Sequence, residues 1–427
     1  MSDCEDSEDS CGEEEVVPKW EVRKEWLESI LGEYYQNKVQ VREFEICPRS
    51  TSNESVLSDI IHVQVKYVYT HARYKLDIVI KRLPDDPFSR FFVTEGQYDL
   101  REIKFYTQIL PDLKDFQKKH IKYDKVKNFD EVVLKVPVCY YAHYSPAGGT
   151  DDSPVPPESI LVLSDLHMDN RWDVKFSEGL TFDQAKAALD SIACIHAHSL
   201  CMKVIDGQPL PERYPFLFQK AKATDSYQQL VERGFTQLAH FLERVSGLEM
   251  VLEALMALRP KTKDIIMTLL APEGPLALIT HTDFWCNNLL FSKLSDDDDL
   301  VCHILDWQMV AYSRPTNDVA LLLVSSLPSK LRRKHTESLL DTYWNTLNET
   351  SSLFGIDIPK DLGYTRADLT KDYRRSQLLA LLLCIGSIDI ALGHPQTEQR
   401  LIDVLQDLHN DGILTDEVAI TITEADA

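Results

Sequence analysis

Basic residues are scarce in this sequence of 427 residues. Lysine and arginine number 45 against 68 aspartates and glutamates, which leaves a formal net charge of −23. A protein that tracks the phosphates of a nucleic acid needs a basic face, and this balance argues against one. A local lysine and metal ions are still sufficient to bind a nucleotide in an acidic protein. The charge balance therefore excludes nucleic-acid binding but not nucleotide binding.

Paired cysteines and long apolar runs are also missing. The nine cysteines are scattered and form no Cys-x-x-Cys pair, so they indicate neither a disulfide framework nor a zinc site. The longest apolar stretch, residues 378–385, is well short of the ~20 residues that a membrane-spanning helix requires. The N-terminus has neither the basic nor the apolar region of a signal peptide. We therefore expect a cytoplasmic protein without a membrane span.

The order of the expected elements indicates an α+β fold with two lobes. Residues 1–17 are rich in acidic side chains and are expected to form a disordered tail. Hydrophobic periodicity predicts helices over 20–35 and 90–110, the second ended by Pro111, and strands over 39–46, 60–69, 74–82, 132–142 and 159–163. From Thr181 the chain is mainly helical, apart from a short β segment at 276–307. This order predicts a small β-rich N-terminal lobe, residues 18–160, and a larger mainly helical C-terminal lobe, residues 161–427.

The most informative segment is a polar loop followed by a strand that ends in aspartate. The loop runs His281-Thr-Asp283 to Asn288, and Asp306 follows 18 residues later at the end of an apolar run. Phosphoryl transfer needs a carboxylate to accept the proton of the attacking hydroxyl and oxygen ligands for Mg²⁺. The pattern predicts Asp283 as catalytic base, Asn288 and Asp306 as magnesium ligands, and His281 as a brace for the loop. The structural alternative is that His281 and Asn288 cap turns of a core hairpin.

A lysine upstream completes the expected nucleotide site. Lys81 ends the third predicted strand, on the face opposite Leu76, Ile78 and Ile80. A lysine at this position can reach the α- and β-phosphates of a nucleotide when an acidic residue on the following helix orients it. Glu102 is the expected partner, and Glu95 is a second candidate.

These residues resemble a known group of kinases. Lys81, Glu102 and the loop from His281, together with Leu161-Val-Leu-Ser-Asp165-Leu166, are similar to the CHK kinase-like family. That family includes the ecdysteroid kinase-like proteins and belongs to the aminoglycoside phosphotransferase and choline kinase superfamily. The resemblance implies a protein-kinase-like fold that binds ATP between its lobes and transfers the γ-phosphate to a small-molecule hydroxyl. It also implies that adenine contacts the linker at Leu163, Asp165 and Leu166.

Two features depart from the family pattern, and one further residue is assigned a structural role. Thr282 occupies a place where family members commonly have glycine, and the expected phosphate-covering loop, residues 49–58, contains no glycine. Without glycine a backbone cannot approach phosphate as freely. Asp318 follows the β segment, and we interpret it as the cap of the next helix.

The predicted activity is ATP- and Mg²⁺-dependent phosphorylation of an alcohol, with an ecdysteroid or another lipophilic alcohol as the leading acceptor. A choline, ethanolamine or xenobiotic kinase of the same superfamily is one alternative. A non-catalytic pseudokinase that binds partners is the other, and the missing glycines favour it. The sequence fixes neither the acceptor nor the oligomeric state.

Overall fold

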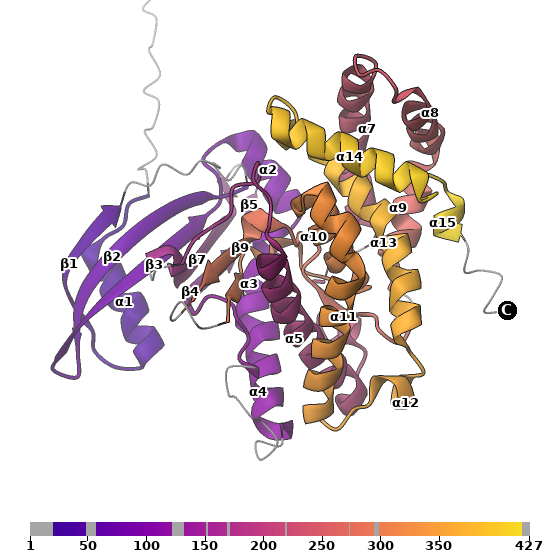
Figure 1. The fold of residues 1–427 in the computed structure, drawn as a ribbon. Coiled ribbons are helices and arrows are strands. Elements are labelled where there is room, and N and C mark those ends of the chain that lie inside the picture. Colours follow the sequence, from indigo (N-terminus) through magenta and orange to yellow (C-terminus); the bar gives the residue numbers. More distant parts are fainter. Residues whose placement is uncertain are drawn as a thin grey trace, which may run out of the picture.

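A computed structural model describes residues 20–47, 57–121, 132–150, 153–168, 171–217, 220–272, 274–293 and 299–420. The tail expected over 1–17 and most of the expected phosphate-covering loop lie outside these residues. A curved sheet forms one side of the molecule, and a bundle of helices forms the other (Figure 1). The α+β fold class with a small β-rich lobe and a larger helical lobe is therefore confirmed.

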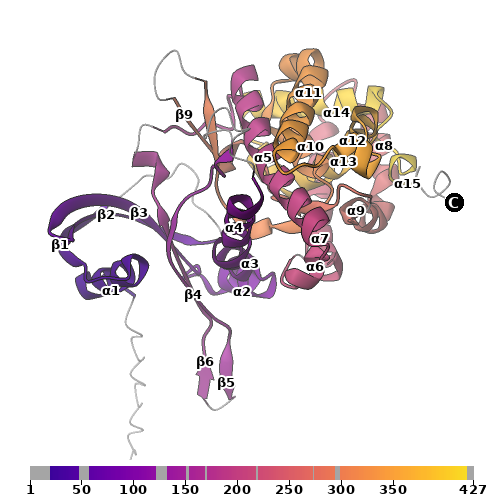
Figure 2. The same ribbon diagram turned by 90° about the horizontal axis from the view of Figure 1, so that it is seen from below.

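The small lobe is built on a five-stranded antiparallel sheet in the order β1-β2-β3-β7-β4. Its strands are β1 (Gln40–Cys47), β2 (Asp59–Tyr69), β3 (Ala72–Arg82), β4 (Cys139–Ser145) and β7 (Glu158–Ser164). Alternating apolar residues in β1 to β3 make one face of this sheet apolar, and helix α1 (Lys24–Tyr35) covers that face (Figure 2). The boundary expected at residue 160 falls inside β7, because the sheet extends to Ser164.

Because side chains alternate along β3, Lys81 points away from the hydrophobic core between α1 and the sheet. Ile78 and Ile80 are fully buried in that core, together with Leu27 and Leu31 of α1. Lys81, one residue further along β3, points from the opposite face towards the large lobe, where its ammonium group meets acidic side chains. The face predicted for Lys81 is confirmed.

The single helix expected over 90–110 is wrong in two places. The structure has α2 (Pro87–Glu95), α3 (Tyr98–Lys104), a π-helical turn (Phe105–Ile109) and α4 (Leu110–His120). The break between α2 and α3 occurs because Gln97 is left-handed, with φ of 56°, and a side chain at Gly96 would collide with the Tyr98 ring. Pro111 does not end the helix, because it lies in the first turn of α4, where no helical N–H is needed.

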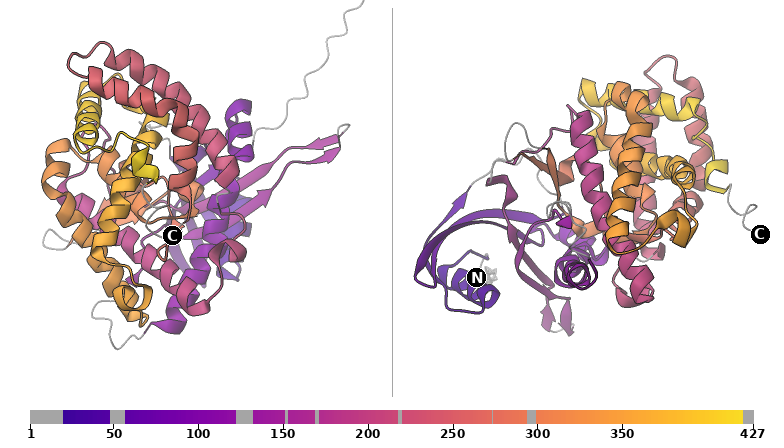
Figure 3. Two further views of the ribbon diagram at one scale, coloured as in Figure 1. Left: turned by 90° about the vertical axis from the view of Figure 1, so that its right-hand side faces the viewer. Right: turned by 60° about the horizontal axis from the view of Figure 1, so that its bottom comes forward.

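Between β4 and β7 the chain forms a projecting hairpin. Strands β5 (Gly148–Thr150) and β6 (Ser153–Val155) pair with each other and extend away from the sheet (Figure 3). The strand predicted over 132–142 begins later, at Cys139, and the segment between it and the strand predicted over 159–163 contains this hairpin.

The large lobe surrounds a short β segment with helices. Its strands form two antiparallel pairs, β8 (Leu278–Thr280) with β11 (Ala311–Ser313) and β9 (Leu289–Ser292) with β10 (Val301–Ile304). The helices are α5 (Phe182–Asp206), α6 (Leu210–Arg213), α7 (Lys220–Leu242), α8 (Glu249–Leu258), α9 (Thr262–Leu270), α10 (Thr316–Ser326), α11 (Ser329–Leu353), α12 (Ile358–Leu362), α13 (Arg366–Gly386), α14 (Pro395–Asn410) and α15 (Glu417–Ile420).

Helix α5 is the central helix of this lobe. By length and composition alone it is apolar enough to cross a membrane, but 72% of that apolar window is buried inside the protein. A core helix of a globular protein passes the same test, so this feature is weak evidence for a membrane span. No other helix of the described residues meets the length and composition criteria.

Candidate active site

Two short strand pairs hold the ends of the polar loop that carries Asp283. β8 pairs with β11 before the loop, and β9 pairs with β10 after it. Inside the loop, Phe284 and Cys286 are fully buried and anchor the chain to the core. Burial raises the pKa of the Cys286 thiol to about 11, so the thiol stays protonated and is a poor nucleophile. The reactive candidates in the loop are therefore its oxygen-bearing side chains.

His281 joins this loop to the segment that carries Asp306. Its Nε2–H donates to the carbonyl oxygen of Leu305 at 2.8 Å, and its Nδ1 accepts from the backbone N–H of Asp283 at 3.2 Å. This pattern assigns the neutral Nε2–H tautomer to the ring. The side chain is completely buried. These contacts place His281 where the predicted bracing role requires it.

Asp283 and Asn288 face each other across the loop. The Asn288 amide Nδ2–H donates to Oδ2 of Asp283 at 2.9 Å and to its backbone carbonyl at 2.8 Å. Burial raises the pKa of Asp283, and the nearby Asp306 carboxylate adds to the rise, while His281 and Asn288 oppose it. A raised pKa makes the carboxylate a better proton acceptor, which is the property expected of a general base.

Lys81 connects the small lobe to Asp306. Its ammonium group donates to Oε2 of Glu102 at 2.7 Å and to Oδ1 of Asp306 at 2.8 Å. Burial alone would lower the pKa of Lys81, but Asp306 and Glu102 together raise it, so the lysine remains charged. Burial raises the pKa of Glu102, and Lys81 opposes that rise. The expected partner, Glu102, is confirmed as the contact, whereas Glu95 is exposed on α2.

Helix α3 presents Glu102 from a fixed position. The neighbouring Arg101 donates through Nε to the carbonyl of Gln308 at 3.0 Å, which ties α3 to the segment just after Asp306. In the following turn, the Phe105 ring stacks on Trp307 with ring centroids 4.0 Å apart and nearly parallel planes. These contacts flank Glu102 and fasten the helix to the Asp306 segment.

Asn288 and Asp306 are the two residues that could hold a magnesium ion together with a nucleotide. The β9–β10 pairing sets Leu289 against Ile304, and the Leu305 N–H donates to the Asn288 carbonyl at 2.9 Å, so the two side chains extend from adjoining positions. The Asn288 amide nitrogen is bonded to Asp283, which leaves the oxygen Oδ1 for a metal. In the part of the chain that the structure describes, no cluster of three or more His, Cys, Asp or Glu side chains could hold a metal. Two oxygen ligands suit Mg²⁺, which usually also binds water and phosphate oxygens.

The prediction that Asp318 caps a helix is wrong. No side chain caps α10, and the fully buried Asp318 carboxylate turns towards the catalytic loop instead. It accepts the backbone N–H groups of His281 and Thr282, each at 2.7 Å, and the Nε2–H of His196 at 3.1 Å. Buried N–H groups need an acceptor, and this carboxylate supplies it. The available signal was an acidic residue directly before the apolar run of 319–324.

Thr282 has a backbone conformation that glycine adopts more readily than other residues. Its φ is 68°, a left-handed conformation that is strained for a β-branched residue. The hydroxyl group is hydrogen-bonded to that of Thr280 at 3.1 Å, and the N–H is held by Asp318. The threonine therefore adopts the backbone conformation that a glycine would take, and no reacting group is displaced.

The linker residues Leu163, Asp165 and Leu166 lie where the small lobe passes into the large one. All three side chains are buried. The Asp165 carboxylate accepts from His62 at 2.7 Å and from the His167 N–H at 3.1 Å, and these bonds help to lower its pKa despite burial. Its own N–H donates to the carbonyl of Asp77. The Asp165 side chain thus stabilises the linker, and the predicted adenine contacts stay a prediction.

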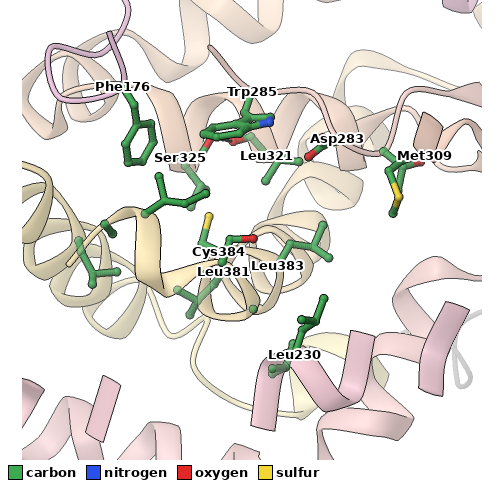
Figure 4. A pocket seen from close by; sticks show the side chains of 18 of the residues that line it. Phe176, Leu230, Asp283, Trp285, Met309, Leu321, Ser325, Leu381, Leu383 and Cys384 are labelled. Atoms are coloured by element: carbon green, nitrogen blue, oxygen red, sulfur yellow. Dashed lines mark hydrogen bonds between the residues drawn. The ribbon is translucent and has the colours of Figure 1, made fainter. Parts of the chain in front are cut away.

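A cavity of about 270 Å³ opens beside Asp283 in the large lobe. Its lining is mostly apolar and comes from α7, α10, α13 and α14 together with Phe176, Trp285 and Met309 (Figure 4). Among the described lining residues, Asp283 is the only carboxylate. The polar lining residues to which the sequence assigned no role include Tyr98, Gln308 and Arg400. Tyr98 precedes Glu102 by one helical turn, a spacing that places both on the same face of α3.

Comparison with known proteins identifies the chain's relatives. A sequence model of the ecdysteroid kinase-like family matches residues 52–356. No curated protein sequence matches the chain.

Three solved structures align over most of the chain. A choline kinase from Cryptosporidium parvum is 11% identical, with a TM-score of 0.44 over 87% of this chain and 91% of its own. An ethanolamine kinase from Plasmodium vivax is 10% identical, with a TM-score of 0.41 over 89% and 83%. A microcompartment-associated aminopropanol kinase is 10% identical, with a TM-score of 0.42 over 87% and 94%. Similarity at this level is too distant to transfer residue roles or substrates.

Proposed function

The chain belongs to the ecdysteroid kinase-like family, and from that premise we propose that it is an ATP- and Mg²⁺-dependent kinase of a small lipophilic alcohol. One observation carries the proposal. The Asp283 carboxylate lines an apolar cavity and is bonded to Asn288, next to an Asp306 that binds Lys81 of the other lobe. The proposed proton acceptor, Asp283, and the proposed phosphate anchor, Lys81, are thereby linked to the same site.

The proposed reaction assigns one task to each of these side chains. Asp283 accepts the proton of the acceptor hydroxyl as its oxygen forms a bond to the γ-phosphorus and the bond to the departing ADP oxygen breaks. Lys81 offsets the negative charge of the nucleotide phosphates, and Glu102 keeps it in place. When bound by Asn288 and Asp306, magnesium would neutralise phosphate charge. His281 and Asp318 hold the loop that positions Asp283.

The lining of the cavity supports a lipophilic acceptor. Leu321, Val324, Leu401 and similar side chains from several helices form most of its wall, which favours an apolar molecule such as an ecdysteroid or another sterol-type alcohol. A quaternary ammonium acceptor such as choline is best recognised by aromatic and acidic groups. Because Asp283 is the only carboxylate of the described lining, we rank choline and ethanolamine lower.

The pseudokinase alternative loses part of its support. Thr282 takes up a left-handed conformation and leaves Asp283, Asn288 and Asp306 in contact with their partners. Catalytic groups that retain this arrangement favour an enzyme. We place its activity in the cytoplasm, since all seven cysteines in the described part of the chain are free, as suits a reducing compartment.

The experiment that tests the proposal measures ATP consumption and Mg-ATP binding in the same preparations. Wild-type protein is offered a panel of sterol and amine alcohols, and binding is followed by thermal shift. Asp283→Ala should lower turnover by about 100- to 10,000-fold, since a general base contributes that much, and should leave Mg-ATP binding largely intact. Asp306→Ala should lose both. Asp264→Ala, an exposed position on α9, is the control and should behave as wild type.

Three outcomes would each contradict a part of the proposal. Near-normal turnover by Asp283→Ala would show that this carboxylate is not the base. A wild-type protein that gives no thermal shift with Mg-ATP and phosphorylates no alcohol would favour the pseudokinase. Phosphorylation of choline but not of sterol alcohols would keep the kinase and replace the acceptor class.

A further inference from the structure

The acceptor cavity contains a buried guanidinium group without a counter-ion. Arg400 of α14 lines the cavity and is only 8% exposed. Its Nη2 donates to the backbone carbonyl of Phe176 at 2.6 Å, and its guanidinium carbon lies 4.3 Å from the centre of the Phe176 ring. In the described part of the chain, no carboxylate lies within ion-pair distance of Arg400.

The same lobe pairs a neighbouring buried arginine in the ordinary way. Arg332, 5% exposed, is hydrogen-bonded to the carboxylate of Asp407. An ionised group removed from water is costly unless an opposite charge or several hydrogen bonds compensate it. A guanidinium group has five N–H donors, and a single carbonyl satisfies only one of them. The charge of Arg332 is therefore paired, although its Nη1 is buried without a hydrogen-bond partner, whereas Arg400 has both donors and charge to spare.

Burial makes the charged form of Arg400 less favourable than it would be in water. Desolvation lowers the pKa of Arg400, and the ionisable groups that influence it are the thiols of Cys286 and Cys384 and the like-charged Arg332. A guanidinium group nevertheless stays protonated in proteins. The cavity wall around it consequently carries a positive charge that forms no ion pair with any acidic side chain of the described residues.

Arg400 contacts Phe176, and both residues line the same cavity as Asp283. Figure 4 shows Phe176, which Arg400 contacts, on one side of the pocket, with Trp285 and Leu321 between it and Asp283. A molecule with its reacting hydroxyl at Asp283 would thus extend along an apolar wall towards Arg400. At position 179 the chain has glycine, and a side chain there would meet Nη1 of Arg400 at 2.8 Å. The absence of that side chain leaves room for the guanidinium group.

We propose that the acceptor is an amphipathic alcohol with an oxyanion, such as a carboxylate or a sulfate, at the end remote from the reacting hydroxyl, and that Arg400 binds this group. The inference rests on the proposed kinase function, because that function places the hydroxyl at Asp283. The oxyanion supplies the missing counter-ion, and a carboxylate can accept two parallel hydrogen bonds from a guanidinium group. The apolar middle of the ligand packs between the two polar ends.

The test compares one ligand pair that differs only in charge. A hydroxysteroid carboxylic acid and its methyl ester are measured for equilibrium binding and for kcat/KM with wild-type protein, Arg400→Gln and Arg400→Lys. Wild type should prefer the acid by about 10- to 100-fold, as expected for hydrogen bonds to a charged group. Arg400→Gln should abolish this preference by weakening the acid alone, and Arg400→Lys should retain part of it.

A matched control separates recognition from a structural role. Arg374→Gln removes another arginine that donates to a backbone carbonyl, here that of Asp411 at 2.7 Å, but on the exposed surface. This variant should keep the wild-type preference. If Arg400→Gln weakens acid and ester equally, Arg400 serves only to hold Phe176, and the proposal is wrong. Equal affinity of wild type for both ligands, or affinity for neither, also overturns it.

The binding measurement tests the Arg400 site, and the turnover measurement tests the kinase function. Selective binding of the acid without phosphate transfer would uphold the Arg400 site and contradict the kinase function. Phosphorylation of both ligands with equal efficiency would uphold the kinase and contradict the Arg400 site.

Discussion

Replacement of Asp318 by asparagine tests how the catalytic loop is held. Asp318 is completely buried and accepts the backbone N–H groups of His281 and Thr282, both at 2.7 Å. Asparagine has the same shape but replaces one accepting oxygen by an N–H₂ group. One of the two backbone N–H groups would then face a donor instead of an acceptor.

The expected cost follows from these bonds. Loss of one hydrogen bond to a charged group costs about 1.5–3 kcal/mol, and an N–H left buried without an acceptor costs about 1–3 kcal/mol more. We therefore expect Asp318→Asn to lose roughly 3–5 kcal/mol of stability. The loop also loses the bond that holds Thr282 in its left-handed conformation. Because Asp283 follows directly, kcat should fall about 100-fold, as is typical of a misplaced catalytic group.

The assay compares unfolding and turnover with those of a true capping residue. Asp357 is the N-cap of α12 and accepts from the Lys360 N–H at 3.1 Å on the exposed surface. Asparagine caps helices about as well as aspartate, so Asp357→Asn should stay within about 0.5 kcal/mol of wild type. If Asp318→Asn unfolds and turns over like Asp357→Asn, Asp318 does no more than a cap, and our account of the loop is refuted.

Three further perturbations address other parts of the site. Thr282→Gly should change the free energy of unfolding by no more than about 1 kcal/mol, because relief of left-handed strain is offset by the flexibility of glycine in the unfolded chain. Turnover should persist in this variant, and a tenfold loss would assign a role to the threonine hydroxyl. Gly234→Ala places a Cβ 1.8 Å from the carbonyl oxygen of Ile385, so α7 and α13 must separate. We expect the free energy of unfolding to fall by about 1–3 kcal/mol. The KM for the acceptor should rise more than the KM for ATP. As the proposed base, Asp283 must be ionised, and burial raises its pKa above the usual 3.8. The kcat should therefore fall with decreasing pH, with a midpoint above 3.8. A midpoint at or below 3.8 would contradict the role of Asp283 as base.

Periodicity in the sequence was sufficient to predict the small sheet and the side of Lys81. The runs that became β2 and β3 are rich in β-branched residues, and their alternation alone assigns Ile78 and Ile80 to one face and Lys81 to the other. The breaks within 87–120 were not predictable in the same way. They depend on the Tyr98 ring, which fills the space beside Gly96, and on a π-helical turn before Pro111.

The residues of the candidate site were predicted in part because phosphoryl transfer restricts which side chains are usable. In the proposed reaction Lys81, Asp283, Asn288 and Asp306 are reacting or ligating groups, so spacing and residue type pointed to them. Asp318 has no such signature, since its function is to accept two backbone N–H groups from a loop 36 and 37 residues earlier. Arg400 was missed for a related reason. Only the folded structure shows that this arginine is buried and forms no ion pair with a carboxylate of the described residues.

Two strained residues lie at the site itself, and their partners come from distant parts of the chain. Thr282 and Asp306 have φ of 68° and 62°, and non-glycine residues in this region cost of order 1–3 kcal/mol each. Thr282 is held by Asp318 of α10, and Asp306 is held by Lys81 of the small lobe. Neither conformation would persist in an isolated loop, because neither partner is local. The geometry around Asp283 therefore depends on contacts from both lobes, and Lys81, the proposed phosphate anchor, supplies one of them.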